Sequence, residues 1–244
     1  MPDAIQNETV RVSGLSNREF LQTYARPGRV GLSGGFGLVD KAICRAQRHL
    51  DEEERWGAWS HAFIFQGVRH DGHHWIIESN LQVHHKHIQL GVQENRTSKY
   101  EDEKSYPVLA VLDFGLNEEQ IAALLREGLE LVATRARYSL RELFGTLIAL
   151  RHPELRRRDN LLAQDRSMYC SAFVQHLFRK MGVELAPGVN GKNTTPQDVF
   201  RTAVPHVSYL LQRREPRTSL DQLKIRVRKS VRTQIRGLRK AVKS

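Results

Sequence analysis

The chemistry in this sequence centres on a cysteine that is expected to begin a helix. Residues 167–182 (SMYCSAFVQHLFRKMG) place apolar side chains at helical spacing, and Gly182 stands where a C-terminal cap belongs. Cys170 then falls in the first turn, where unpaired N–H groups and the positive end of the helix dipole favour a thiolate over a thiol. The alternative is that Cys170 only packs in the core, as free cysteines commonly do.

A cysteine nucleophile needs a base and a group that orients that base. Two polar residues interrupt segments that are otherwise expected to be buried strands, His61 in WSHAFIF and Glu78 in WIIES. The Asp-Gly turn at residues 71–72 predicts an antiparallel hairpin in which His61 lies opposite about residue 82, so Glu78 is displaced along the sheet. Each residue also has a structural interpretation. His61 could be satisfied by backbone at a strand edge, and Glu78 could face solvent at a strand end.

The order His61, Glu78, Cys170 resembles that of the circularly permuted NlpC/P60 enzymes, the YiiX/YebB-like permuted papain-like amidases. In that family the histidine and the acidic residue on the sheet precede the cysteine helix. Other short motifs agree over roughly residues 25–205. They are GRVGL at 28–32, the predicted helix at 38–50, YSLREL at 138–143 and TPQDV at 195–199.

The resemblance implies a permuted papain-like fold and a thiol mechanism. Cys170 would attack an acyl carbon, His61 would take the thiol proton and return it to the leaving group, and Glu78 would orient the imidazole. The backbone N–H of Cys170 would be one oxyanion donor, with Tyr138 or a group near residues 33–36 as candidates for the second. The chain departs from the family pattern at Arg29, where an acidic residue is frequent, and in the long stretch 152–167.

The remaining pattern is a cluster of strands followed by helices, which indicates an α+β fold. Strands are expected at 29–33, 59–68, 73–79, 84–92 and 107–114, and the polar stretch 94–106 is interpreted as a loop. Helices are expected at 17–24, 38–50, 117–137, 139–150 and 170–181, and after Thr195 with Pro196 in the first turn. The predicted divisions are a lead-in (1–24), a catalytic domain (25–210) and a tail (211–244).

No metal ion or cofactor is expected. His84 and His87 have a metal-like spacing, but positions three apart on one strand face opposite sides. The histidines of this region are therefore interpreted as a solvated, pH-sensitive rim. They are His70, His73, His74, His84, His85 and His87. The glycine run 34–37 lacks the Lys-Ser/Thr ending of a phosphate loop. Cys44, the other cysteine, is interpreted as a packing residue, and a disulfide to Cys170 is not favoured.

The C-terminal residues carry most of the net charge. Of the formal +11, residues 213–244 contribute +10, from twelve Lys/Arg against Glu215 and Asp221, which leaves +1 for the rest. Between residues 219 and 243, apolar side chains recur every three or four positions among basic ones, which predicts a basic amphipathic helix. It could lie on an anionic membrane or dock on its own domain or a partner protein. Nucleic acid is the least favoured partner because no aromatic residue interleaves the basic ones.

The expected function is a thiol hydrolase that acts through a thioester, most simply on amide or peptide bonds. The alternatives are a lipid-ester hydrolase or acyltransferase of the same fold, and a catalytically idle binding module with a cationic tail. No run reaches the roughly 18 to 20 apolar residues of a membrane span, and the start lacks the layout of a secretory signal. A cytoplasmic protein that associates peripherally with a membrane is expected. The substrate and the oligomeric state are left open.

Overall fold

The computed structural model describes residues 7–50, 52–53, 55–84, 87–134, 145, 148–150, 152–158 and 168–213, with the backbone alone for residues 81–84, 87–90 and 153. The predicted tail helix at 219–243, Tyr138 and most of the helix predicted at 139–150 lie outside these ranges. Within the described ranges, no helix has the length and apolar character needed to cross a membrane.

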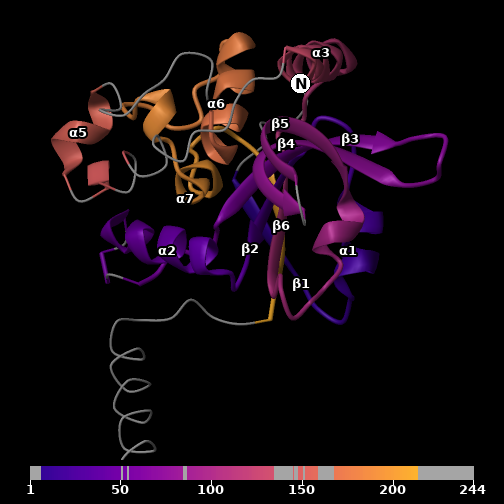
Figure 1. The fold of residues 1–244 in the computed structure, drawn as a ribbon, viewed down its shortest axis with the longest axis horizontal. Coiled ribbons are helices and arrows are strands. Elements are labelled where there is room, and N and C mark those ends of the chain that lie inside the picture. Colours follow the sequence, from indigo (N-terminus) through magenta and orange to yellow (C-terminus); the bar gives the residue numbers. More distant parts are fainter. Residues whose placement is uncertain are drawn as a thin grey trace, which may run out of the picture.

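A mixed seven-stranded sheet forms the centre of an α+β fold (Figure 1). Its order is β1-β7-β6-β2-β3-β4-β5. The strands are β1 (Glu8–Val12), β2 (Val30–Gly34), β3 (His61–Val68), β4 (His74–His84), β5 (His87–Arg96), β6 (Val108–Asp113) and β7 (Val207–Gln212). Neighbouring strands are antiparallel except β1 and β7, which are parallel.

Helices cover both faces of this sheet (Figure 1). They are α1 (Asn17–Tyr24), α2 (Leu38–Ala46), α3 (Glu118–Ala133), α5 (Pro153–Arg157), α6 (Cys170–Lys180) and α7 (Pro196–Phe200), with short 3₁₀ turns η1 (Gln47–Leu50), η2 (Thr97–Tyr100) and η3 (Gly191–Asn193). The larger core cluster contains Phe173 and Leu177 of α6 and Leu124 of α3. A second cluster contains Phe20 and Leu21 of α1. The sheet is therefore buried from both sides.

Alternation along β3 decides which side chains meet which helix layer. Ala62 and Ile64 belong to the cluster of α6, whereas Phe63 and Phe65 belong to the cluster of α1. Because successive strand residues point to opposite faces, His61 lies on the Phe63 side. Glu78 lies on the side of Ile76, which belongs to the same cluster as Phe63. The two residues thus share one face before any detailed contact is considered.

Most predicted elements are confirmed, including the cap of α3. Asn117 Oδ1 accepts from the Gln120 N–H at 2.9 Å, and Gln120 Oε1 accepts from the Asn117 N–H at 3.0 Å. After α6, Gly182 adopts a φ of 75°, the left-handed conformation that a helix C-terminus favours for glycine. The predicted strands at 29–33, 59–68 and 107–114 correspond to β2, β3 and β6.

Other predictions are wrong in informative ways. Residues 8–24 are not a separate lead-in, because β1 pairs with β7 and α1 contributes to the core. β7 runs to Gln212 and so crosses the domain boundary predicted at residue 210. The stretch 94–106 is not simply a loop, since β5 continues to Arg96 and η2 follows. His84 and His87 do not share a strand, because they pair with each other across the β4–β5 hairpin.

Candidate active site

A β-bulge sets the positions of His61 and Glu78 relative to each other. From the turn outwards, the ladder pairs Val68 with His74, Gly67 with Trp75, Phe65 with Ile76 and Ile64 with Ile77, with the register shift between Phe65 and Gly67. Continuing the register beyond the bulge places His61 opposite Asn80, not opposite residue 82 as predicted. Glu78 is then a diagonal neighbour of His61 on the same face, within reach of a long side chain.

The two side chains make direct contact. His61 Nε2 lies 2.6 Å from Glu78 Oε2. The Glu78 side chain is 0% exposed and the His61 side chain 13% exposed. A charged carboxylate at such depth must be compensated by donors or cations. The solvent-facing interpretation of Glu78 is therefore excluded.

Four side chains surround the Glu78 carboxylate. Oε2 accepts from Tyr100 Oη at 2.7 Å as well as contacting His61. Oε1 accepts from Asn95 Nδ2 at 2.7 Å and forms an ion pair with Lys99 Nζ. Burial alone would raise the pKa of Glu78, but the His61 hydrogen bond and the Lys99 charge outweigh it and hold the pKa well below its usual range. Glu78 is thus a buried, fully bonded carboxylate.

Lys99, Tyr100 and Asn95 are residues of this site that the sequence analysis missed. They lie at the end of β5 and in η2, within the stretch interpreted as a loop. Tyr100 is itself fixed by stacking on Phe63, with ring centroids 4.6 Å apart. The signal that could have found them is the acidic residue in a buried strand, because such a residue calls for a cation from a neighbouring segment.

Cys170 is the first residue of α6, as predicted, and its side chain faces the start of β3. Sγ lies 4.0 Å from the carbonyl oxygen of Ser60, the residue before His61. Cys170 is 3% exposed. Helix α6 therefore presents its sulfur at the end of the sheet where the imidazole is located.

His61 connects the sulfur and the carboxylate. Burial opposes the charged imidazolium, but interactions with Cys170, including a hydrogen bond, and then with Glu78 outweigh it and raise the pKa of His61 to about 9. Since Nε2 contacts Glu78, the ring nitrogen that remains for Cys170 is Nδ1. The structure thus brings the three predicted residues together in the order Cys170–His61–Glu78.

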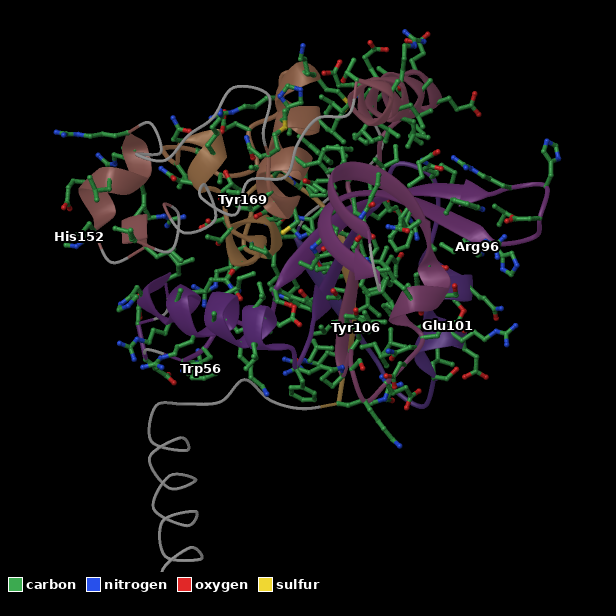
Figure 2. All side chains as sticks on the ribbon, in the orientation of Figure 1. Trp56, Arg96, Glu101, Tyr106, His152 and Tyr169 are labelled. Carbon is green, nitrogen blue, oxygen red and sulfur yellow. The ribbon has the colours of Figure 1, made fainter. Side chains whose placement is uncertain are left out.

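Hydrogen bonds from two directions hold the start of α6. From the sheet, Ser79 Oγ donates to the Met168 carbonyl at 2.6 Å. From the other side, Tyr169 Oη and Ser171 Oγ donate to the Thr194 carbonyl at 2.7 and 2.8 Å. Tyr169 lies inside the protein, in the helical part next to the sheet (Figure 2). The residues on both sides of Cys170 are therefore fixed.

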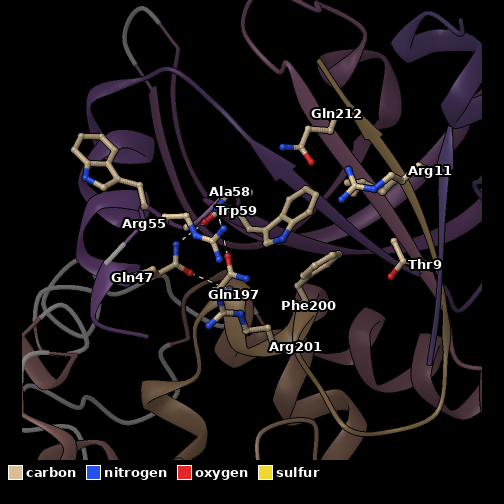
Figure 3. Close-up of a pocket in the computed structure, with 13 residues that line it drawn as sticks. Thr9, Arg11, Gln47, Arg55, Ala58, Trp59, Gln197, Phe200, Arg201 and Gln212 are labelled. Carbon is tan, nitrogen blue, oxygen red and sulfur yellow. Dashed lines mark hydrogen bonds between the residues drawn. The ribbon is translucent and has the colours of Figure 1, made fainter. Parts of the chain in front are cut away.

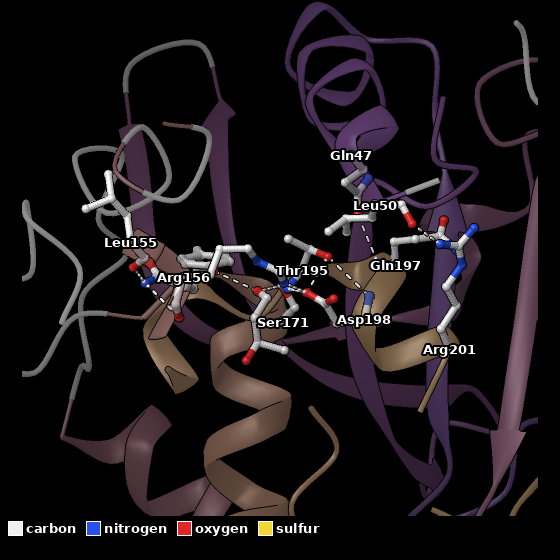
Figure 4. A network of polar contacts seen from close by, with 12 residues as sticks. Gln47, Leu50, Leu155, Arg156, Ser171, Thr195, Gln197, Asp198 and Arg201 are labelled. Carbon is white, nitrogen blue, oxygen red and sulfur yellow. Dashed lines mark hydrogen bonds and ion pairs between the residues drawn. The ribbon is translucent and has the colours of Figure 1, made fainter. Parts of the chain in front are cut away.

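A second polar network extends this support to α5 and α7 (Figure 4). Arg156 Nη2 lies 2.5 Å from Asp198 Oδ2, and the same carboxylate oxygen accepts from the Thr195 N–H and hydroxyl at 2.8 and 2.7 Å. Asn193 Nδ2 donates to the Leu155 carbonyl at 3.1 Å. Thr195 and Pro196 begin α7 as predicted. The TPQDV motif thus contributes to the hydrogen-bonded network that supports the start of α6, where Cys170 lies.

Two of the three residues border a cleft with a volume of about 230 Å³, whereas Glu78 is buried and does not line it. His61 and Cys170 line it together with Ser33, Val39, Asp40, Ile43, Ser60, Asn80, Lys99, Tyr100 and Tyr106. Within the stretch 33–36, Ser33 is the residue that lines the cleft, and its buried hydroxyl has no hydrogen-bond partner among the described residues. The other candidate for a second oxyanion donor, Tyr138, is outside the described ranges.

Comparison with known proteins gives a structural match alone. No family model matches the chain, and neither does any curated protein. The crystal structure of the metalloprotein YiiX from Escherichia coli O157:H7 (DUF1105) matches with a TM-score of 0.50 and 14% identity, over 76% of this chain and 96% of that chain. The chain has a YiiX-like fold. At that identity the likeness concerns the fold, and the term metalloprotein describes that protein.

Other residues singled out in the sequence also have described positions. Among the residues whose side chains are described, no three His, Cys, Asp or Glu residues are grouped so that they could hold a metal ion. Both cysteines are free. Cys44 is buried in the core as predicted, and burial raises the pKa of its thiol to about 12. Arg29, where the resembling family often has an acid, forms an ion pair with Asp113 of β6.

Proposed function

We propose that the protein is a cysteine hydrolase of the permuted papain-like (NlpC/P60) type, with Cys170 as nucleophile, His61 as general base and acid, and Glu78 as the residue that orients His61. The observation that carries the proposal is the position of one imidazole between a carboxylate, 2.6 Å from Nε2, and a thiol at a helix start. Nucleophile, base and orienting group in hydrogen-bonded sequence are the signature of covalent acyl transfer.

The proposed reaction has two halves. With the proton on His61, the Cys170 thiolate adds to the acyl carbon, and the carbonyl π electrons move to oxygen. The Cys170 backbone N–H, at the start of α6, stabilises that oxyanion. Collapse breaks the bond to the leaving amine, which takes the proton from His61. His61 then removes a proton from water, the hydroxide adds to the thioester, and the thiolate leaves with the carboxylic acid product released.

The surroundings of Glu78 favour this proposal over an idle binding module. A buried carboxylate with an imidazole, a lysine, a tyrosine and an asparagine as partners requires substantial desolvation of charged groups. Apolar residues would fill the same volume without that cost. Strongly shifted pKa values beside a cleft are typical of sites that do chemistry, and both His61, which lines the cleft, and its buried partner Glu78 have them.

The lining of the cleft favours an amide or peptide substrate. Polar or charged side chains predominate there, and Asp40, Lys99 and Tyr106 can all engage the polar groups of a peptide. One observation favours the lipid-ester alternative. Leu38 and Val39 at the start of α2 are 88% and 49% exposed, and Val39 also lines the cleft. An apolar pair at the rim would suit an acyl chain, so the experiment must include both substrate types.

The proposal is tested by trapping the acyl-enzyme. The full chain is incubated with an activated peptide ester and with an activated fatty-acyl ester, quenched in acid, digested and weighed by mass spectrometry. An acyl adduct on the peptide that contains Cys170 is expected, and Cys170→Ser should abolish it. Cys44→Ala is the matched control and should retain it. If no adduct forms, or if it persists in Cys170→Ser, Cys170 is not the nucleophile. Which of the two esters forms more adduct identifies the substrate class.

The proposal also assigns a role to the tail, residues 211–244, which would hold the enzyme at a membrane surface. Residues 219–243 are proposed to bind an anionic membrane through a basic amphipathic helix, which would make the protein peripheral to that membrane. Co-sedimentation with anionic vesicles should then be lost when residues 214–244 are removed. A truncated chain that still sediments would contradict this part alone.

A further inference from the structure

A second pocket lies on the far part of the sheet from Glu78, where β1 and β7 pair (Figure 3). Its volume is about 400 Å³, within the usual range for small-molecule sites. The lining comes from β1, β7, η1, α7 and the segment before β3.

The charge of this pocket has one sign. Arg11 of β1, Arg55 before β3 and Arg201 after α7 bring three guanidinium groups from distant parts of the sequence to one cavity. No aspartate or glutamate is among the described lining residues. Glu53, outside the lining, lies 3.4 Å from Arg55 at the exposed surface. For Arg11, no ion pair or hydrogen bond of the side chain is found within the described ranges.

The buried polar groups of the pocket add donors to these cations. Gln197 is 7% exposed, and its Oε1 accepts from the Ala58 N–H at 3.3 Å. Its Nε2 has no hydrogen-bond partner in the part of the chain that the structure describes. The same holds for the indole Nε1 of Trp59, which is 1% exposed. Buried donors are almost always paired in native proteins, so the unpaired indole N–H of Trp59 beside three arginines indicates a missing acceptor.

The remaining walls are apolar. Trp59 packs on Phe200 with ring centroids 4.9 Å apart, and Leu210 lines the same pocket and belongs to the same core cluster. Trp56 is half-buried at the rim. The cavity therefore offers cations and amide donors to one end of a ligand and aromatic surface to a small organic remainder.

We propose that this pocket binds a phosphate ester, with the phosphate held by Arg11, Arg201 and the Gln197 amide. Guanidinium groups match phosphate oxygens in bidentate geometry, and a phosphate has enough acceptors for several donors at once. The phosphate can belong to a soluble ester or to a lipid headgroup. The proposal is independent of the hydrolase chemistry, because Cys170, His61 and Glu78 do not line this pocket.

The variants that test it are chosen to preserve the fold. Gln197→Glu keeps the oxygen that accepts from Ala58 but replaces the free donor with a negative charge. Arg11→Gln removes a cation from an exposed position on an edge strand. The matched control is Arg126→Gln, an exposed arginine on α3. All are made in the full chain, so each retains the cationic tail, and Trp75→Phe leaves Trp56 and Trp59 as the fluorescent reporters.

Binding is measured by fluorescence titration with inorganic phosphate and glycerol 3-phosphate, and by sedimentation with phosphatidylcholine vesicles with and without phosphatidic acid. Glycerol 3-phosphate should bind, with Kd raised about tenfold or more in Gln197→Glu and Arg11→Gln and unchanged in Arg126→Gln. The same variant pattern with phosphatidic acid vesicles alone assigns the phosphate to a lipid headgroup. The site would be overturned if neither glycerol 3-phosphate nor phosphatidic acid vesicles bound, or if binding were weakened equally in all three variants. Thermal unfolding confirms that each variant is folded.

Discussion

His61 and Glu78 meet at 2.6 Å although neither is the other's direct partner in the β3–β4 ladder. The bulge between Phe65 and Gly67 shifts the register by one residue and leaves Glu78 diagonal to the imidazole. Diagonal contact suits a long side chain, and it engages Nε2 while leaving Nδ1 for the sulfur. The contact between His61 and Glu78 thus depends on the extra residue of the bulge, Gln66.

The first prediction concerns thiol reactivity. At pH 6.5, His61→Ala should slow alkylation of Cys170 by iodoacetamide about tenfold or more, because the imidazolium that stabilises the thiolate is lost. The measurement is the rate of adduct formation on the Cys170 peptide by mass spectrometry.

The matched control for this prediction is His176→Ala. His176 of α6 makes the same kind of contact, with Nε2 2.9 Å from Glu127 Oε1, but it does not line the cleft. Its removal should leave the alkylation rate unchanged. Equal rates in His61→Ala and the parent protein at pH 6.5 would argue that the imidazole does not activate the sulfur.

The second prediction concerns alkaline pH. Hydrolysis should decline as pH rises through about 9, since the His61 pKa is raised to about 9 and loss of that proton removes the general acid. The raised pKa also contributes stability that is fully present below about 6.5 and is lost as pH rises through about 9. Urea unfolding at pH 6 and pH 10 should therefore show a smaller loss of stability in Cys170→Ala than in the parent.

The third prediction concerns acid pH and Lys99. The lowered pKa of Glu78 contributes stability that is present above about 4.5 and is lost as pH falls through the folded-state value. Lys99→Met removes a cation from this carboxylate and should lower the unfolding free energy at pH 7 by about 1–3 kcal/mol. Its acid unfolding should begin at higher pH than that of the parent.

For this prediction the matched control is Lys104→Met. Lys104 is exposed, and its side chain has no contact with Glu78, so a change within about 0.5 kcal/mol is expected. Urea melts of both variants make the comparison. If the two lysines were equivalent, Lys99 would be a surface residue with no part in holding the carboxylate charged.

The fourth prediction concerns the link between the sheet and the cysteine helix. Ser79→Ala leaves the Met168 carbonyl without its hydrogen bond and should cost about 1 kcal/mol of stability. If the bond positions Cys170, kcat should fall while KM stays close to the parent value. Ser105→Ala, which loses an exposed hydrogen bond to Asp102, should change neither. Equal kcat values for Ser79→Ala and Ser105→Ala would show that the position of Cys170 does not depend on this contact.

The fold class and the positions of Cys170, His61 and Glu78 could be predicted because they leave periodic or compositional signals in the sequence. Cys170 is visible because it precedes an apolar stripe with helical spacing. His61 and Glu78 are visible because they are polar residues in otherwise apolar strands. The bulge left no such signal, and it accounts for one of the two positions between the predicted partner, residue 82, and Asn80. The pairing of Val68 with His74 at the turn accounts for the other. Lys99 and Tyr100 were missed because a polar stretch with little periodicity resembles a loop. Strand β1, at the edge of the sheet, and strand β7 beside it were missed because each is short, and β1 is also largely exposed.

The charges around Glu78 form a set that sums to zero when the sulfur is a thiolate and the imidazole is protonated, with Lys99 as the second cation. Acylation would turn the sulfur into a neutral thioester and leave the set with one surplus positive charge. The interaction that most favours the proton on His61 would vanish at that moment. The imidazolium would then become a stronger acid at the step in which the departing amine needs a proton, so the charge balance itself would time the proton transfer.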